Sequence, residues 1–473
     1  MIRKRLGLVI GPFLFCIVFF FEPFAGLDSS ANAVLASTLW VASWWLSEAL
    51  AISATALLPI VLLPLTGGAP IAQTTAAYGD KMLYLFVGGF IIAIAMQRWN
   101  LHRRIAIEII SAVGTNARFI VLGFMLASGL LSMWISNTAT TLMMVTIAAA
   151  LIAEIRELTG ESGKLFFKAL LLGIAFSASI GGVATLVGTP TNPIFVSIAN
   201  KLYGQEFSFA TWMAFALPFS LIMLVFCWVV LTRLVFPLHK VDMPIGRELI
   251  QKEKEALGKM GQEERAVATV FIITAVLWIT RSFLLDQLIP GINDTVIAIG
   301  AALTMFIIPS KEKKGKPLLT WEEAERLPWG VIILFGGGLS IAAAFQSSGL
   351  AEWLGHQLTG VSGLPTFVII LIVALVVNFL TEVTSNVATA SIMLPVLAAL
   401  AEAIGIHPFL LMIPATMAAS CAFMLPIATG PNAIVFSSGE LKINDMVRAG
   451  VWLNIVSSLL ISVLVYFVLP SFL

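Results

Sequence analysis

The sequence has little charge. Only 11% of its 473 residues are charged, and the formal net charge is +1. A soluble domain could not cover its surface with so few polar groups, so this composition excludes an ordinary soluble protein. A net charge near zero also leaves no basic face that could neutralise phosphates, which excludes nucleic acid as a partner.

Cysteine and histidine are scarce as well. Cys16, Cys227 and Cys421 lie in apolar stretches without a CxxC or Cys/His spacing, so they predict no disulfide framework. The four histidines form no metal-ligand pair along the sequence. Because an intramembrane hydrolase needs a nucleophile with a base, or a metal site, we expect no enzyme.

Apolar residues, in contrast, are abundant and fall in long runs. They make up 59% of the chain, and the mean hydropathy is +0.99. Runs such as 217–231 and 451–469 approach the ~20 residues that cross a bilayer core. The sequence therefore predicts a multi-pass protein of the cell inner membrane. Basic residues precede the first run as in a signal peptide, but 19–23 (FFFEP) offer no small-residue cleavage site, so we expect this run to be the first span.

The apolar runs predict an all-α fold of about eleven transmembrane helices plus two re-entrant hairpins, 118–155 and 364–404. A polar tripeptide interrupts each hairpin region in its middle. In this topology only Lys81, Lys201 and Arg281 of the 27 lysines and arginines lie outside the cell, as the positive-inside rule requires. The N-terminus is then cytoplasmic and the C-terminus external.

The two halves of the chain resemble each other. Short motifs recur at a constant offset of 249 residues, namely Leu85-Phe86 with Gly88-Gly89 as Leu334-Phe335 with Gly337-Gly338, and Ser136-Asn137 as Ser385-Asn386. We expect a first repeat over 1–238, a cytoplasmic linker over 239–265 and a second repeat over 266–473. Because the first hairpin lies inside and the second outside, the repeats are inverted. Inverted repeats are typical of transporters, with a binding site near the midplane at the repeat interface.

Four polar windows interrupt the apolar pattern. Two are the hairpin tips, 132–141 and 381–389, and two lie in the predicted broken helices 165–200 and 407–440, at 181–193 and 426–432. In hydrocarbon, exposed backbone groups are costly, so such breaks survive only around a cavity or within protein. The freed N-terminal N–H groups attract anions, and the freed C-terminal carbonyls attract cations.

Charge is nearly absent from these windows, where Glu382 is the only charged residue. A bound dianion would meet no lysine or arginine there, so a co-bound cation is the simplest source of compensating charge. Hydroxyl, amide and backbone oxygens are hard ligands suited to sodium. The windows therefore favour cation-coupled anion binding. Isolated serines and threonines could instead join helices together, and Glu382 could be either a proton-linked group or a structural partner near the hairpin tip.

The hairpin tips and breaks resemble the divalent-anion:sodium symporter family, the INDY-like dicarboxylate and citrate carriers. The resemblance covers essentially the whole chain and rests on Ser136-Asn137-Thr138, Ser385-Asn386, Gly188-Thr189-Pro190 and Ala428-Thr429-Gly430-Pro431-Asn432. It implies a homodimer in which a scaffold domain holds the dimer while a transport domain crosses the membrane in an elevator motion.

The same resemblance implies the site residues. A first sodium (Na⁺) site would use Ser132, Ser136, Asn137 and the backbone at Gly188. A second would use Thr381, Thr384, Asn386 and the backbone at Ala428. The carboxylates of the substrate would meet Asn137 and Thr138 at one hairpin tip and Asn386 at the other, while Thr189 and Thr429 close the pocket.

Val387 departs from the pattern of bacterial dicarboxylate members, which commonly carry a second Ser-Asn-Thr. Valine removes a hydroxyl beside one carboxylate and leaves pocket shape more dominant. Animal citrate and dicarboxylate carriers also have valine there, so transport is not excluded and the preferred anion stays open.

The function implied is sodium-coupled symport of C4-dicarboxylates such as succinate, malate or fumarate. The alternatives are a sodium-independent dicarboxylate exchanger and a citrate- or sulfate-type anion carrier. A sodium/proton carrier would want paired acidic residues that the windows lack. A channel would not need inverted hairpins that close over one site.

Overall fold

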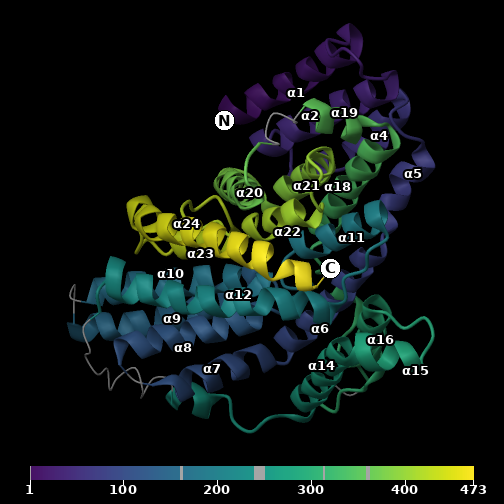
Figure 1. Cartoon of the computed structure of the whole chain (residues 1–473). Helices are drawn as coiled ribbons and strands as arrows, with labels where there is room; N and C mark the ends of the chain where they lie inside the picture. Colours follow the sequence, from purple (N-terminus) through teal and green to yellow (C-terminus); the bar gives the residue numbers. More distant parts are fainter. Residues whose placement is uncertain are drawn as a thin grey trace.

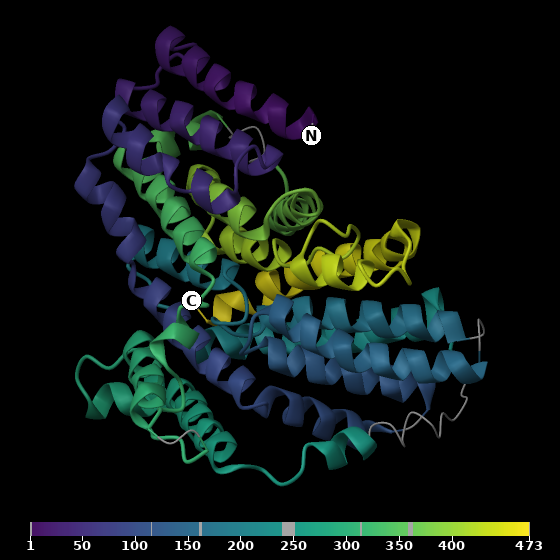
Figure 2. The same cartoon turned by 180° about the vertical axis from the view of Figure 1, so that it is seen from behind.

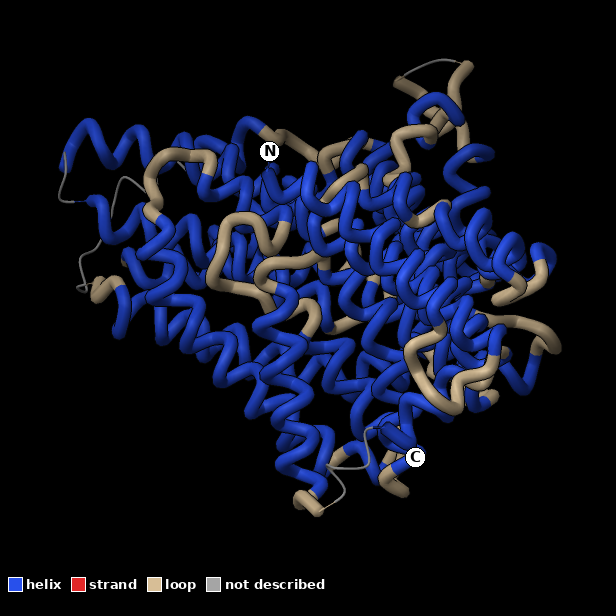
Figure 3. The backbone as a smooth tube through the Cα atoms, turned by 90° about the horizontal axis from the view of Figure 1, so that it is seen from above, coloured by secondary structure: helices blue, strands red, loops and turns tan. Residues whose placement is uncertain are grey.

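The computed structural model describes residues 2–114, 116–159, 163–238, 251–312, 315–357 and 363–472. Every named element in these ranges is a helix, and Figure 3 shows helices along nearly all of the described chain. The predicted linker 239–265 is described only from residue 251, so its residues 239–250 lie outside the described part.

The helices of the first half begin at the N-terminus and run to residue 229. They are α1 (Ile2–Phe21), α2 (Ser29–Ser47), α3 (Ile52–Thr55), α4 (Leu58–Thr66), α5 (Ile71–Ala76), α6 (Lys81–Arg98), α7 (Leu101–Val113), α8 (Ala117–Ser132), α9 (Asn137–Thr159), α10 (Lys164–Val183), α11 (Thr191–Tyr203) and α12 (Phe209–Val229). Figure 1 shows α8, α9, α10 and α12 running alongside one another, while α1 and α2 lie at the opposite edge of the molecule.

The helices of the second half follow the linker. They are α14 (Gln262–Thr280), α15 (Asp286–Leu288), α16 (Asp294–Ile307), α17 (Trp321–Ala324), α18 (Trp329–Ser347), α19 (Leu350–Gln357), α20 (Thr366–Thr381), α21 (Asn386–Ala403), α22 (Phe409–Ala418), α23 (Gly430–Phe436) and α24 (Ile443–Phe467). In Figure 2, α14 to α16 form a corner of their own, in contact with α6.

Nine helical segments of the described chain are long and apolar enough to cross a membrane, and five shorter apolar helices accompany them. The outermost helices leave large apolar side chains exposed, for example Phe20 at 70% on α1 and Ile272 at 58% on α14. Such apolar surface suits contact with lipid rather than water. The chain is thus an all-helical, multi-pass membrane protein, as predicted. The count of eleven crossings and the re-entrant course of the hairpins stay predictions.

The predicted hairpin regions are helix pairs with matching turns. In the first pair α8 ends at Ser132 and α9 begins at Asn137, and in the second α20 ends at Thr381 and α21 begins at Asn386. Both boundaries keep the 249-residue offset of the sequence motifs. In each half the first helix therefore ends four residues before the Ser-Asn motif, and the asparagine of that motif begins the next helix.

Both predicted broken helices contain an interruption. The first extends from the end of α10 at Val183 to the start of α11 at Thr191, inside the predicted window. The second already begins after Ala418, whereas the sequence predicted it only at Pro426. This expectation was wrong because residues 419–425 contain no proline or glycine, and their helix is ended by contacts with other helices instead.

The two halves interlock at these interruptions. The short helix α23 of the second half packs against α9 and α10 of the first, and α11 of the first half packs against α21 and α22 of the second. Each hairpin therefore touches the broken helix of the opposite half, and Figure 1 shows α11 and α22 adjacent at the centre of the molecule. This exchange brings all four polar windows to one place.

A matching corner supports the internal repeat. Asn100 between α6 and α7 has φ +57°, and Gly349 between α18 and α19 has φ +75°. The two residues are again 249 positions apart, and both adopt the left-handed conformation that asparagine and glycine tolerate best. The corner between the two helices is thus repeated in both halves, although the residue at the corner differs between them.

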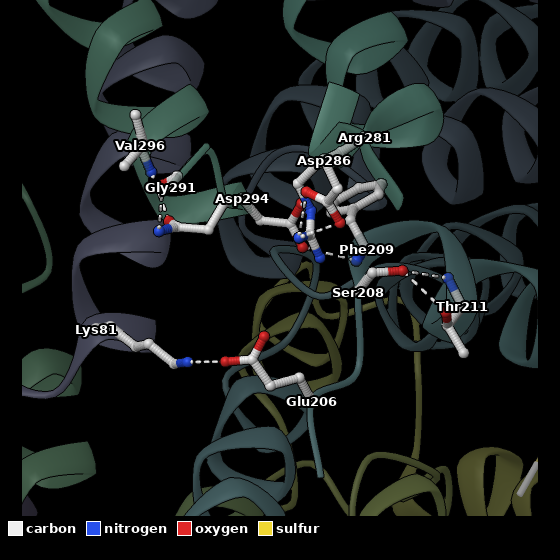
Figure 4. A network of polar contacts seen from close by, with 11 residues as sticks. Lys81, Glu206, Ser208, Phe209, Thr211, Arg281, Asp286, Gly291, Asp294 and Val296 are labelled. Atoms are coloured by element: carbon white, nitrogen blue, oxygen red, sulfur yellow. Dashed lines mark hydrogen bonds and ion pairs between the residues drawn. The ribbon is translucent and has the colours of Figure 1, made fainter. Parts of the chain in front are cut away.

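A buried ion pair joins three helices at the corner that contains α14 and α16 (Figure 4). Arg281 Nε lies 2.7 Å from Asp294 Oδ1, and the two residues are only 8% and 6% exposed. Asp294 Oδ2 accepts a 2.8 Å hydrogen bond from the backbone N–H of Phe209 at the start of α12. The pair therefore fixes α12 relative to α14 and α16.

Candidate functional site

A cavity of about 320 Å³ lies where the hairpin turns and the helix interruptions meet. This volume is at the small end of the range for small-molecule pockets. Its polar wall consists of residues from all four windows, namely Ser136, Asn137, Thr138, Gly188, Thr189, Thr384, Ser385, Asn386, Ala428 and Thr429. The apolar wall includes Phe86 and Phe90 of α6, whose rings lie 4.4 Å apart.

Oxygen atoms converge on one end of the Asn137 side-chain amide. This end contacts the Ser132 hydroxyl and lies 3.3 Å from the carbonyl oxygen of Ala178 and 3.2 Å from that of Gly188. With nitrogen at this end, the amide donates to these oxygens. With the amide turned, its oxygen would lie beside three further oxygens, and hydroxyl, amide and backbone oxygens are the ligand types that hard cations take at unwound helix ends.

A second oxygen cluster occupies the equivalent place in the other half. Thr381 Oγ1 lies 2.8 Å from Asn386 Oδ1 and 2.9 Å from the carbonyl oxygen of Ala419. Thr381 and Asn386 stand at the positions of Ser132 and Asn137 in the repeat. The two hairpin turns thus present the same chemistry, a hydroxyl and an amide facing the carbonyls of an interrupted helix.

Two buried asparagines hold the interruptions open. Asn192 Nδ2 donates to the carbonyls of Val183 at 3.1 Å and Thr185 at 2.7 Å. Asn432 Nδ2 likewise donates to the carbonyls of Ala422 at 3.2 Å and Leu425 at 3.0 Å. Each amide therefore satisfies carbonyl groups that the ending helix leaves unpaired, which a buried break requires.

Glycines allow the hairpin turns to approach the interrupted helices. A Cβ added at Gly182 would lie 2.5 Å from Asn137 Oδ1, and one at Gly430 would collide with the Thr138 hydroxyl. A larger residue at either position would therefore displace the Asn137 amide or the Thr138 hydroxyl. The second contact joins the two halves, because Thr138 belongs to the first hairpin and Gly430 to the second interrupted helix.

Hydroxyl groups also connect the two interruptions directly. Ser420 Oγ lies 2.8 Å from Thr191 Oγ1 and 3.4 Å from Thr189 Oγ1, and all three residues are buried. Thr189 lines the cavity, while Ser420 follows the carbonyl of Ala419 in the second oxygen cluster. The two clusters are therefore joined by a short polar chain through the interior.

Among the described residues, no cationic side chain lines the cavity. Glu48 is the only charged residue among the described residues that line it. The positive dipole ends of α9 and α21, which begin at Asn137 and Asn386, face the cavity instead. These partial charges orient an anion but do not neutralise a dianion, so a bound cation would add the missing charge.

The cavity continues towards the N-terminal helix. An adjoining hollow of about 570 Å³ shares Glu48, Ile52, Pro328 and Val331 with it. Glu48 has φ +51°, an uncommon conformation for a residue other than glycine, and its carboxylate lies 4.0 Å from Lys4 Nζ of α1. This pair thus stands at the entrance on the side of the molecule where α1 lies.

The structure brings the predicted site residues together. All six residues expected to bind substrate line the cavity, namely Asn137, Thr138, Thr189, Asn386, Val387 and Thr429. Of the residues expected to bind sodium, Ser132 and Thr381 are fully buried behind the cavity wall, and the others line it. Their roles as ligands stay predictions.

Sequence reasoning missed the carbonyls of Ala178 and Ala419. Backbone carbonyls leave no signal in residue type, so the sequence contained nothing that could have identified these two oxygens. It also missed Glu48, since a single acidic residue at the end of an apolar run looks like an ordinary boundary. Phe86 belongs to the repeated Leu-Phe motif and lines the cavity, but its apolar side chain does not distinguish it from a packing residue.

An all-helical membrane protein with interlocked halves and one cavity between interrupted helices has the architecture of a secondary transporter. The family model described as the sodium:sulfate symporter transmembrane region matches residues 3–469. The chain therefore belongs to this family, which is the divalent-anion:sodium symporter family that its motifs resemble.

Two relatives in staphylococci are similar over nearly their whole length. Both are named sodium-dependent dicarboxylate transporter SdcS. The one of Staphylococcus saprophyticus is 45% identical over 478 residues, covering 99% of this chain and 92% of the relative. That of Staphylococcus aureus is 45% identical over 476 residues, covering 99% and 91%.

Two solved structures resemble the fold at low sequence identity. The Alcanivorax borkumensis YdaH transporter matches with a TM-score of 0.60 and 15% identity, covering 84% of this chain and 87% of the other. Neisseria gonorrhoeae MtrF, described among antimetabolite efflux pumps, matches with a TM-score of 0.57 and 12% identity, covering 94% and 96%. At these identities the similarity concerns the fold alone.

Proposed function

We propose that this protein is a secondary active transporter that couples the entry of C4-dicarboxylates, such as succinate, malate or fumarate, to sodium ions. The observation that carries the proposal is the pair of repeat-related oxygen clusters beside a cavity that no cationic side chain of the described residues lines. The 45% identity to proteins named as sodium-dependent dicarboxylate transporters supports the same ion and substrate class.

In this proposal each sodium ion occupies one oxygen cluster. The first takes the side chains of Ser132, Ser136 and Asn137 with the backbone at Gly188. The second takes Thr381, Thr384 and Asn386 with the backbone at Ala428. Because both clusters lie at the cavity wall, the two ions compensate the charge of the dianion and hold the hairpin turns against the interrupted helices.

The substrate then lies between the two hairpin turns. Asn137 and Thr138 meet one carboxylate, and Asn386 meets the other. Thr189 and Thr429 close the pocket from the interrupted helices, and Val387 contacts the carbon chain. Since the ions complete the anion site, a cavity without sodium binds dicarboxylate weakly, and this dependence couples the two fluxes.

The proposal includes the setting of the carrier. It is a homodimer of the cell inner membrane with a cytoplasmic N-terminus and an external C-terminus, and its transport domain moves past a scaffold in an elevator motion. The repeats 1–238 and 266–473, with hairpins 118–155 and 364–404, provide the two interlocked halves. The apolar exterior of α1 and α14 supports the membrane setting.

Uptake of labelled succinate into proteoliposomes tests the proposal. We expect accumulation with an inward sodium gradient and none when potassium replaces sodium, because the site then lacks its compensating charge. Entry by exchange alone, independent of sodium, would make the protein an exchanger instead. Competition by citrate and sulfate, measured in the same vesicles, tests the citrate- and sulfate-type alternatives.

Val387→Thr is expected to change selectivity more than abundance. Val387 lies in the cavity wall at 8% exposure, and threonine has nearly the same shape but adds a hydroxyl that can donate to a carboxylate. We expect inhibition of succinate uptake by malate, fumarate and citrate to shift in relative order by about threefold to tenfold. An unchanged competition profile would exclude a role of this side chain in selectivity.

A further inference from the structure

Glu382 is a buried carboxylate that the proposed site does not use. It follows Thr381 in the second hairpin turn and is only 3% exposed. Among the described residues it forms no ion pair, so no lysine or arginine offsets its charge there. A buried charge without a cation is costly unless hydrogen bonds replace its hydration.

Four hydrogen bonds provide that replacement. Glu382 Oε1 accepts from the backbone N–H of Phe423 at 2.7 Å and of Met424 at 2.8 Å, and Oε2 accepts from the N–H of Leu425 at 2.9 Å. Asn454 Nδ2 of α24 donates to Oε1 at 2.7 Å. Three successive N–H groups thus point at one carboxylate, an arrangement that binds anions elsewhere in proteins.

These three N–H groups belong to the interruption between α22 and α23. Residues 419–425 contain no helix breaker, yet α22 ends at Ala418 and the chain stays non-helical up to Thr429. Glu382 satisfies the donors that a helix would otherwise pair. Its carboxylate therefore pairs the N–H groups of this segment, as the Asn432 amide pairs two of its carbonyls. The segment also includes the Ala419 carbonyl, which accepts from Thr381, and Ala428, which lines the cavity.

The first half holds its interruption in another way. The position equivalent to Glu382 is Met133, whose backbone carbonyl accepts a hydrogen bond from the Thr185 hydroxyl. The same hydroxyl accepts from the N–H of Gly188 at 3.2 Å. A neutral threonine thus does in the first half what a charged glutamate does in the second.

We infer that Glu382 is a positioning residue for the second cation site: its carboxylate fixes residues 423–425 so that the carbonyls of the second interruption face Thr381 and Asn386. The inference rests on the proposed function. The inference also predicts that the two cation sites respond differently. Loss of the carboxylate affects the second cation site, whereas the first, which Thr185 holds, stays intact.

Glu382→Gln tests this role in purified protein reconstituted into proteoliposomes. Glutamine keeps the size of the side chain, but one oxygen becomes an NH₂ group that faces a backbone N–H. We expect the sodium concentration for half-maximal succinate uptake to rise about tenfold or more, since hydrogen bonds to a charged group are lost. The Hill coefficient for sodium should fall, while the succinate KM at saturating sodium stays within about twofold because the cavity wall is intact.

Two further variants separate positioning from folding. Asn454→Ala removes one of the four hydrogen bonds and leaves the carboxylate, so it should raise the same sodium constant by a smaller factor, about threefold. Glu352→Gln makes the identical change at an exposed residue of α19 and should leave both constants unchanged. A defect in folding alone would lower the maximal uptake rate. The sodium concentration for half-maximal uptake by the correctly folded molecules would stay unchanged.

The outcomes are distinguishable from failure of the proposed function. Wild-type vesicles without sodium-dependent uptake would refute the proposed function itself. If wild type is sodium-dependent, an unchanged sodium constant in Glu382→Gln overturns the inference, as does an equal rise in the sodium constant and the succinate KM. Should Glu382→Gln not reach the membrane, an unchanged sodium constant in Asn454→Ala overturns it.

Discussion

Replacing Asn137 or Asn386 by alanine is expected to reduce sodium-dependent succinate uptake by about a hundredfold or more. Each amide stands in one oxygen cluster and lines the cavity, so alanine removes a contact to the ion and a contact to the carboxylate together. Two contacts to charged groups, each worth about 1.5–3 kcal/mol, correspond to a loss of at least this size.

Uptake must be compared at equal amounts of folded protein. Asn200→Ala on α11 makes the same substitution outside the cavity and should retain wild-type uptake. Thermal unfolding in detergent gives an independent measurement, since sodium should raise the midpoint of the wild type over potassium, and each cavity variant should lose part of that rise. Near wild-type rates in well-expressed Asn137→Ala and Asn386→Ala would refute the site assignment.

Arg281→Met is expected to lower the free energy of unfolding by about 3–5 kcal/mol. The substitution leaves the Asp294 carboxylate buried without its cation, 2.7 Å from where the guanidinium stood. The same carboxylate caps the start of α12 at Phe209, and Trp278 donates to the Asp294 carbonyl at 2.9 Å. Denaturant unfolding of the purified protein in mixed micelles measures the loss.

A second substitution in the same pair identifies the cause. The double variant Arg281→Met, Asp294→Asn should recover most of the stability, because the amide still accepts from Phe209 but carries no charge. Lys81→Met breaks the exposed ion pair with Glu206 (Figure 4) and should cost at most about 1 kcal/mol. Equal losses in the Arg281 and Lys81 variants would contradict a special role of burial.

Local sequence signals predicted much of the fold. Runs of apolar residues predicted the membrane class, because each helix in lipid must be apolar along its whole length. The polar tripeptides predicted both hairpin turns, since Ser132 and Asn137 stand at the helix ends and their counterparts Thr381 and Asn386 do so again. The first interruption was also predictable from its glycine and proline residues.

The second interruption could not be located from the local sequence. Nothing in residues 419–425 ends a helix, and the sequence placed the break seven residues too late. The break depends on Glu382, which is distant from this segment in the sequence. The residues of the segment itself therefore do not indicate where the helix ends. Glu382 itself is visible in the sequence. Its partners are backbone N–H groups, which every residue except proline has, so the sequence does not show which of them it binds.

The sequence by itself determined the residue types of the candidate site and their repetition, because hydroxyl and amide side chains in an apolar chain are visible at once. Only the tertiary structure decided that they meet. The interlocking of α23 with α9 and of α11 with α21 brings windows from both halves to one cavity, and it selects the carbonyls of Ala178 and Ala419. Such contacts depend on packing between segments far apart in the chain, and backbone oxygens carry no residue-specific signal from which a sequence could predict them.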